Sequence, residues 1–313
     1  MRNRKSCVFC PGNERLTPSP VYIVGRDGNL SRASKAEKDS AWLIRVVPNF
    51  YPAVYPDTRS KAASTPGAFP AVGHHEIIVE SPRHFQRIQG MGLAHLQAII
   101  RAYRDRVEAL STKAYVNYVS VFRNYGKEAG ASQRHPHSQL VTLPFTPPTI
   151  AQEVARFKTS LRDEGACPLC ELSGGETKPK SILWEGERFT VVCPLFSAYP
   201  YETWIVPNRH EKNFQKISVE ETGELSPIIK SLFHTFSQVL NDPPHNLWIH
   251  TSPREAEDFH WHIEAIPRLG EVGGLEMSTA VHVNTLLPED AASNLRRCFA
   301  SRIKRLGFNP SHN

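Results

Sequence analysis

The segments Glu76-Ile-Ile-Val-Glu-Ser-Pro-Arg-His84 and Glu202-Thr-Trp-Ile-Val-Pro-Asn-Arg-His210 align without a gap in this 313-residue chain. In each segment a short apolar run with β-branched residues leads into a turn that carries Arg-His, a pattern typical of a strand that ends in a turn. The repetition indicates that the chain contains two copies of one structural unit.

Further features repeat around this segment, in the same order in both halves. A Cys-x-x-Cys pair precedes it, and a helix-period apolar pattern, a second strand and a His-x-His motif follow it. These features are Cys7/Cys10 and Cys167/Cys170, the helical stretches Leu93–Leu110 and Glu220–Leu240, the strands Tyr118–Arg123 and Leu247–His250, and the motifs His135-Pro-His137 and His260-Trp-His262. The step from the Arg-His to the first histidine of the closing motif is 51 residues in one half and 50 in the other.

The repeat predicts an α+β fold made of two tandem halves, which we place at residues 1–150 and 151–313. Each half is expected to contain antiparallel strands and one main helix. Two such units can pair their sheets, so we expect a larger half-barrel or saddle.

Each half also supplies two cysteines and two histidines that can bind one metal ion. We predict Cys7, Cys10, His84 and His135 at one site, and Cys167, Cys170, His210 and His260 at the other. Two thiolates and two imidazoles are a complete tetrahedral set for zinc, and a closed set leaves no position for a catalytic water. The expected cofactor is therefore structural Zn²⁺, one or two ions per chain.

Composition and charge limit the classes of partner that this protein is expected to bind. The formal net charge is +6 and the sequence pI is about 9.0, which suits an anionic substrate, but the basic residues are spread out. A nucleic-acid binder usually shows a denser basic stripe, so we expect no nucleic acid partner. No apolar run is long enough to cross a bilayer, so we expect no membrane partner. No apolar signal-peptide region follows the N-terminus, which favours a cytoplasmic protein.

The most specific motif is Gly126-Lys-Glu-Ala-Gly-Ala-Ser-Gln-Arg-His-Pro-His137-Ser-Gln139, preceded by Phe122-Arg-Asn124. Together with Cys7-Val-Phe-Cys10 and Gly273-Gly-Leu-Glu-Met277, it resembles the galactose-1-phosphate uridylyltransferase family, in the same order over nearly the whole chain. That family belongs to the histidine-triad superfamily, so the resemblance implies histidine-triad-like halves. The second cysteine–histidine set and the tail around Asn284 look like the related ADP-glucose phosphorylase branch.

The resemblance implies a histidine nucleophile. His137 would attack the α-phosphorus of a nucleotide sugar, hold the nucleotidyl group covalently and pass it to a second phosphate. Gln139, which shares a strand face with His137, would donate to a phosphate oxygen as charge builds. The candidate substrate-binding residues are Asn124, Ser132, Ser138 and Glu276, the last of which matches a position that contacts sugar hydroxyls.

The second half departs from this pattern, because Glu264 stands where the first half has Gln139. A carboxylate would repel a phosphate, so His137 rather than His262 is expected to be the nucleophile. Glu153 lies where some family members place a carboxylate metal ligand. His74 and His75 are interpreted as surface histidines.

The predicted function is transfer of a nucleoside monophosphate from a UDP-glucose-type donor to a hexose 1-phosphate through nucleotidyl-His137. The alternative is a phosphorylase that moves an adenylyl group from ADP-glucose to inorganic phosphate. A hydrolase and a zinc-stabilised nucleic-acid-binding module are further alternatives, but the latter does not explain His137 or Gln139. The resemblance also implies a homodimer.

Overall fold

The structure is a computed structural model that describes residues 6–30, 41–56, 69–174 and 179–310. Its strands are β1 (Tyr22–Gly25), β2 (Trp42–Pro48), β3 (His75–Val79), β4 (Tyr118–Tyr125), β5 (His137–Leu143), β6 (Ile182–Glu185), β7 (Phe189–Val192), β8 (Thr203–Pro207), β9 (His245–His250) and β10 (His262–Pro267). Its helices are α2 (Leu93–Ser111), α3 (Pro148–Asp163), α4 (Pro168–Gly174), α5 (Val219–Val239), α6 (Gly274–Thr279) and α7 (Pro288–Arg305), with short 3-10 helices η2 (Glu14–Leu16), η3 (Ile88–Gly90) and η4 (Phe214–Lys216). Within the described ranges, none of the helices is both long and apolar enough to span a membrane.

The strands form one open, ten-stranded antiparallel sheet in the order β1-β2-β3-β5-β4-β9-β10-β8-β7-β6. The order is symmetric about its centre, where β4 of the first half pairs with β9 of the second. Phe122 lies opposite Trp248 across this junction. Within their own halves these residues lie opposite Gln139 and Glu264, so a pseudo-two-fold axis passes between Phe122 and Trp248. The predicted α+β fold of two joined halves is confirmed.

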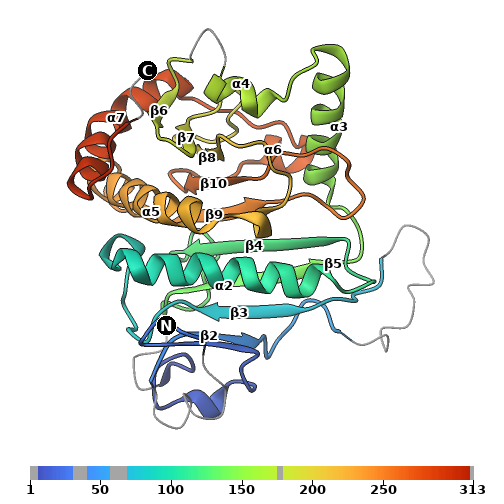
Figure 1. Cartoon of the computed structure of the whole chain (residues 1–313), viewed down its shortest axis with the longest axis vertical. Coiled ribbons are helices and arrows are strands. Elements are labelled where there is room, and N and C mark those ends of the chain that lie inside the picture. Colours follow the sequence, from blue (N-terminus) through green and yellow to red (C-terminus); the bar gives the residue numbers. More distant parts are fainter. Residues whose placement is uncertain (1–5, 31–40, 57–68, 175–178, 311–313) are drawn as a thin grey trace.

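One main helix from each half covers the same face of the sheet (Figure 1). α2 and α5 lie side by side over the sheet, and α7 packs against α5 and β6. The buried apolar side chains of these helices and of the central strands form one core that spans both halves. α5 begins at a capping box in which the Ser218 and Glu221 side chains each bond the other's backbone N–H. The two halves are therefore packed as one unit.

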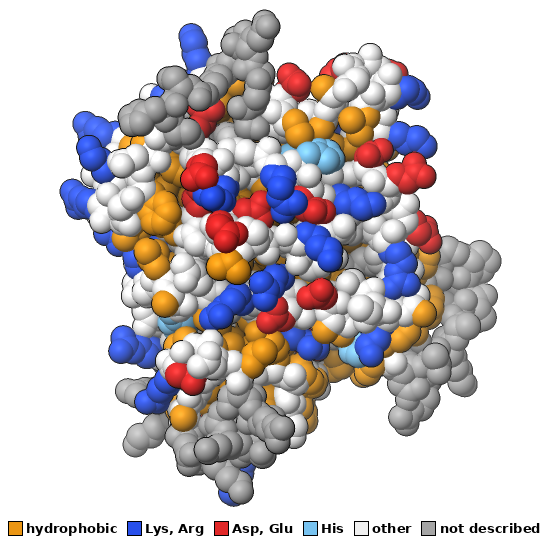
Figure 2. Space-filling view, in the orientation of Figure 1, with side chains coloured by type: hydrophobic (Ala, Val, Ile, Leu, Met, Phe, Trp, Pro, Cys, Tyr) orange, Lys and Arg blue, Asp and Glu red, His pale blue; other side chains and the backbone are white. Residues whose placement is uncertain are grey.

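The helix-covered face carries mixed charge. Figure 2 shows Lys and Arg side chains next to Asp and Glu side chains across this face. This arrangement differs from the continuous basic stripe that is typical of nucleic-acid binders.

Side chains alternate between the two faces of the sheet along β5. Ser138 points toward the helices, since its hydroxyl lies 2.6 Å from the Tyr103 hydroxyl of α2. His137 and Gln139 therefore point to the opposite face. We call this second face the site face.

Helix α3 links the two halves and lies against the site face of the second half. Its Ile150 and Phe157 pack in one apolar cluster with Trp204 and Phe259. The boundary predicted between residues 150 and 151 falls inside the first turn of α3.

Candidate active site and metal centres

The first predicted metal group is assembled in the structure. The ligand atoms of Cys7, Cys10, His84 and His135 all lie within 4.8 Å of one another, and all four residues are buried. Cys10 Sγ lies 3.2 Å from His84 Nδ1, and both cysteine sulfurs lie 3.6 Å from His135 Nδ1. The four side chains thus come together from a turn near the N-terminus, the segment after β3 and the residues before β5.

The second predicted metal group is assembled in the same way. Cys167, Cys170, His210 and His260 have ligand atoms within 4.8 Å of one another. Cys167 and Cys170 lie 3.4 and 3.6 Å from His260 Nδ1, and Cys170 lies 3.4 Å from His210 Nδ1. Because both groups occur at matching positions, the internal repeat extends to these candidate metal ligands.

The outer hydrogen bonds of both groups fit a metal ion. His135 presents Nδ1 to the sulfurs, and its Nε2 lies 2.7 Å from the Ser81 carbonyl oxygen. His260 repeats this arrangement with the Pro207 carbonyl oxygen at 2.9 Å. A carbonyl can only accept, so each Nε2 carries the proton and each Nδ1 keeps its lone pair for a ligand. The donor sets and the ring tautomers both fit structural zinc.

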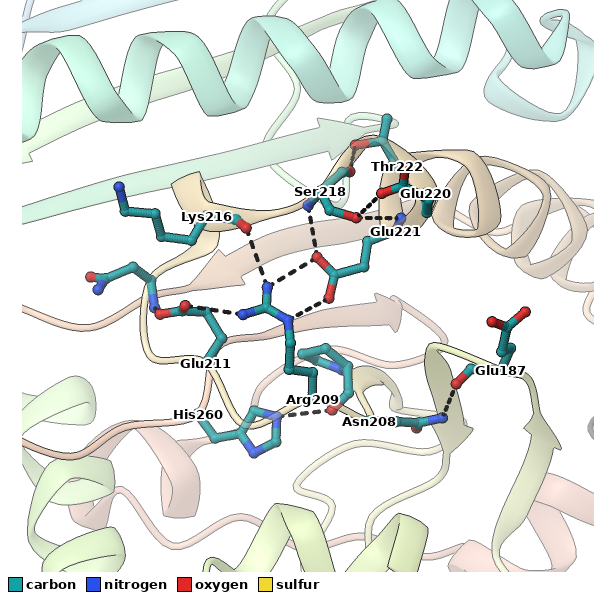
Figure 3. A network of polar contacts seen from close by, with 12 residues as sticks. Glu187, Asn208, Arg209, Glu211, Lys216, Ser218, Glu220, Glu221, Thr222 and His260 are labelled. Atoms are coloured by element: carbon teal, nitrogen blue, oxygen red, sulfur yellow. Dashed lines mark hydrogen bonds and ion pairs between the residues drawn. The ribbon is translucent and has the colours of Figure 1, made fainter.

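Arg209 anchors the turn that carries His210 (Figure 3). Its guanidinium donates to both carboxylate oxygens of Glu221 at 3.0 and 3.1 Å and to Glu211 at 3.2 Å. Glu221 in turn accepts from the backbone N–H of Ser218 in the capping box of α5. The second metal group is thereby tied to the start of the main helix of its half.

His137 is held in one tautomer by the backbone. Its Nδ1 lies 2.8 Å from the carbonyl oxygen of His135, so Nδ1 carries the proton and Nε2 carries the lone pair. The ring lies against Phe9, with ring centroids 5.5 Å apart. Burial lowers the pKa of His137, which keeps the imidazole neutral and nucleophilic at physiological pH.

Gln139 is oriented by His75 from the neighbouring strand β3. The backbone N–H of Ala53 donates to His75 Nδ1 at 3.0 Å, so His75 carries its proton on Nε2. This N–H donates to Gln139 Oε1 at 2.8 Å. The N–H groups of the Gln139 amide are therefore directed away from His75, as donors for another acceptor.

Asn124 lies near the end of β4, beside the glycine-rich loop. Its Oδ1 accepts from Asn246 Nδ2 at 2.8 Å, and the same Asn246 nitrogen donates to the Ala129 carbonyl oxygen at 2.9 Å. The loop also needs a glycine at Gly130, where φ is +84°. Asn246 thus ties the loop to Asn124, and Ser132 follows in an exposed position.

Two of the predicted substrate-binding residues, Ser138 and Glu276, are not grouped with His137 on the site face. Ser138 is fully buried on the helix-covered face of β5, where its hydroxyl donates to Glu80 and lies 2.6 Å from the Tyr103 hydroxyl. Its assignment to substrate binding is corrected, because neighbours along a strand point to opposite faces. Glu276 lies in the short surface helix α6, away from the strands that carry the motif.

In the second half, the titratable residues His250 and Glu264 stand at the positions that match Asn124 and Gln139. His262 Nδ1 lies 3.0 Å from the His260 carbonyl oxygen, but its Nε2 faces Glu264 Oε1 at 3.2 Å. His250 Nδ1 lies 2.9 Å from Glu153 of α3 and 3.2 Å from Glu264. Although burial disfavours its charge, the two carboxylates raise the pKa of His250 to about 10. The nitrogen of His262 that would attack is thus already engaged.

The ligand atoms of Glu153, His250, His262 and Glu264 lie within 4.8 Å of one another, so this group also has the spacing of a cation site. Without a metal ion, a protonated His250 between the two carboxylates offsets one of their two negative charges. The same residues thus form either a metal site or an ion-pair network, and the two states differ in their dependence on pH.

The interpretation of His75 as a surface histidine was wrong, because the ring is half-buried and contacts Gln139. Glu80 was also overlooked, although a charged residue ends an otherwise apolar strand there.

Comparisons with known proteins agree with this geometry. Residues 29–147 match the family model of the galactose-1-phosphate uridyl transferase N-terminal domain, and residues 90–306 match a domain of unknown function (DUF4921). ADP-glucose phosphorylase from Arabidopsis thaliana is 30% identical over 300 residues, which cover 93% of this chain and 81% of that protein. Galactose-1-phosphate uridylyltransferase from Thermotoga maritima is 29% identical over 232 residues, which cover 71% of this chain and 73% of that protein.

A solved structure shows the same likeness over the whole fold. The crystal structure of ADP-glucose phosphorylase from Arabidopsis thaliana, with ADP-glucose bound, matches with a TM-score of 0.82 at 31% identity, and covers 93% of this chain and 89% of that one. A uridylyltransferase structure matches with a TM-score of 0.77 at 25% identity, over 83% of this chain and 86% of that one. With its paired metal groups and its histidine motif at matching strand ends, the chain belongs to the galactose-1-phosphate uridylyltransferase family of nucleotidyltransferases.

Proposed function

We propose that this protein cleaves a nucleotide sugar through a covalent nucleotidyl-His137 intermediate. The observation that carries the proposal is the bond between His137 Nδ1 and the His135 carbonyl oxygen, which leaves Nε2 as a free base. Gln139, oriented by His75, supplies amide donors on the same face of β5.

The chemistry follows from these two side chains. His137 Nε2 forms a bond to the α-phosphorus, and the bond from that phosphorus to the bridging oxygen breaks, so the sugar 1-phosphate leaves as an anion. The Nδ1 proton stays on the ring, which becomes cationic. Gln139 donates to a phosphate oxygen as negative charge builds. An oxygen of the acceptor phosphate then attacks the same phosphorus, and His137 leaves as neutral imidazole.

Two donor–acceptor pairs are consistent with this site. Transfer of uridylyl from UDP-glucose to a hexose 1-phosphate is supported by the family model and by the Thermotoga relative. Transfer of adenylyl from ADP-glucose to inorganic phosphate is supported by the Arabidopsis relative and by the assembled second metal group. The longer and stronger match makes ADP-glucose the first donor to test.

Zinc is proposed as a structural cofactor, with Cys7, Cys10, His84 and His135 holding one ion and Cys167, Cys170, His210 and His260 the other. When bound, it would tie the two cysteine turns to the strand ends. The six cysteines form no disulfide in the structure. Since zinc thiolates persist in a reducing compartment, the cytoplasm is the proposed location.

A homodimer is proposed from the tail. Leu275, Met277, Val281 and Val283 are 53%, 78%, 56% and 54% exposed. An apolar stretch of this kind marks an interaction surface, and Glu276 lies within it. Pairing of two copies would place Glu276 near a site boundary, where it would accept hydrogen bonds from sugar hydroxyls. Light scattering after size-exclusion chromatography tests the dimer, and a monomer at micromolar concentration would exclude it.

The proposed function is tested by intact mass after incubation with UDP-glucose or ADP-glucose, without acceptor. A mass gain of one UMP or one AMP, absent in His137→Ala and kept in His262→Ala, is the expected result and names the base. Addition of phosphate or of a hexose 1-phosphate to the isolated adduct then names the acceptor. Free nucleotide without any adduct would show a hydrolase, and an adduct that survives in His137→Ala would refute the assigned nucleophile.

A further inference from the structure

A buried charged network lies on the helix-covered face of the sheet, behind the nucleophile. Glu80 is 0% exposed, Arg123 is 3% exposed, and Ser138 is 0% exposed. Arg123 Nε donates to Glu80 Oε2 at 3.0 Å. The Tyr103 hydroxyl donates to Glu80 Oε1 at 2.9 Å, and Ser138 Oγ donates to the same oxygen.

Glu80 contacts both chain neighbours of His137. Its backbone N–H donates to the Pro136 carbonyl oxygen at 3.1 Å, and its carboxylate accepts from the Ser138 hydroxyl. Its own carbonyl oxygen accepts from His95 Nε2 of α2 at 2.6 Å. The peptide that carries the nucleophile is therefore held on both sides by one residue, which is itself fixed to the main helix.

The second half provides an internal control, because it has the same backbone and an engaged histidine. Arg123 and Ser138 lie opposite each other on β4 and β5, and Ile249 and Ile263 lie opposite each other on β9 and β10. Ile249 and Ile263 are 2% and 1% exposed, and both lie in the core that the helices cover.

The fold therefore does not require charge at these positions. A buried ion pair is seldom more stable than well-packed apolar residues of similar volume, because its desolvation penalty is large. The half with the free imidazole nitrogen nevertheless keeps the pair, and the half with the engaged imidazole has isoleucines at the places of Arg123 and Ser138. Stability alone does not explain this difference.

We propose that Glu80, Arg123, Ser138 and Tyr103 are positioning residues that hold the His137 peptide and ring in line with the α-phosphorus of the donor. The inference rests on the proposed function. A displacement of about 1 Å at a reacting group lowers a rate roughly 10²-fold. The network acts through the backbone at Pro136 and through Ser138, and it does not touch the substrate.

The test compares an apolar variant, Glu80→Leu/Tyr103→Phe/Arg123→Met/Ser138→Ala, with the wild type. We expect zinc content and the Kd for the donor to stay within about threefold, while single-turnover formation of the nucleotidyl-enzyme slows by about 10²-fold. Ile263→Val, at the matching place in the second half, is the control and should leave the single-turnover rate unchanged. An apolar variant that binds zinc and forms the adduct at the wild-type rate overturns the proposal.

If the apolar variant does not fold, the single variants Ser138→Ala and Ser138→Thr test the proposal. Ser138→Ala should slow adduct formation by up to about tenfold, the size of one neutral hydrogen bond, and Ser138→Thr should restore it. Equal rates in wild type and Ser138→Ala overturn the proposal.

If wild type itself forms no adduct with any donor, the proposed function fails, and crystal structures of wild type and Ser138→Ala still test the positioning. A His137 ring that leaves the His135 carbonyl oxygen supports the proposal, and an unmoved ring overturns it.

Discussion

Replacing His250 and Glu264 by the residues of the first half should remove a pH-dependent part of the stability. The variant His250→Asn/Glu264→Gln places at these positions the neutral residues Asn124 and Gln139 that the first half has at the matching register positions. In the wild type, His250 lies 2.9 and 3.2 Å from two carboxylates, and its side chain is 12% exposed. The group is therefore little screened by solvent.

The magnitude follows from linkage. The pKa of His250 is raised to about 10 in the folded protein from an ordinary value of 6.5. A raised pKa stabilises the fold fully below the unfolded value and less as the pH rises toward the folded value. Between these values the free energy of unfolding falls by about 1.4 kcal/mol per pH unit. Glu264 has its pKa lowered to about 2, so it stays charged throughout this range.

Urea unfolding at pH 7.5, 8.5 and 9.5, extrapolated linearly to water, measures the effect. From the lowest to the highest pH, the wild type should lose roughly 2–3 kcal/mol more than the variant. Other titrating groups are shared and cancel in the comparison. Parallel curves would refute the ion-pair network. A wild-type protein whose relative stability instead rises with pH would indicate a cation bound by neutral His250, and its metal content would then exceed that of the variant.

Three further predictions concern the first half and the metal groups. Since burial lowers the pKa of His137 from its ordinary value of 6.5, the rate of adduct formation should fall only at a pH below that value, and a decline centred near pH 7 would contradict the buried neutral ring. Gln139→Glu should slow adduct formation by about 10²–10³-fold in rapid-quench assays without loss of zinc, and an unchanged rate would exclude a phosphate contact at this position. Cys10→Ser and Cys170→Ser should each lose one zinc ion per chain and a few kcal/mol of stability, as measured by a colorimetric chelator and thermal unfolding. A variant with wild-type metal content would show that its group does not hold zinc.

The sequence was sufficient to predict the repeat, the α+β class and the membership of both cysteine–histidine clusters, because each depends on local patterns that occur twice. The ligand assignment was specific because the Cys-x-x-Cys pairs and the later histidines recur at nearly the same spacing. The grouping of these side chains in space agrees with that prediction. Whether each group holds zinc stays a prediction until metal is measured.

The face of the sheet to which each side chain points, and the strand that it contacts, were harder to predict. Ser138 lies between two site-face residues, so strand alternation alone places it in the interior, and its proximity to the motif was misleading. His75 contacts Gln139 only because β3 pairs with β5, a long-range pairing that no local pattern specifies. The pairing of β4 with β9 across the halves likewise depends on packing of the whole sheet.

Helix α3 covers part of the site face of the second half. Its Glu153 faces His250, and its Ile150 and Phe157 fill the space beside Trp204. The helix that links the halves therefore fills space on the site face of the second half, the face on which the first half carries His137 and Gln139. Substrate binding by the second half would depend on this linker as much as on the histidine motif. Replacing Glu264 by glutamine alone should not create a second catalytic centre, because α3 would still lie against this face.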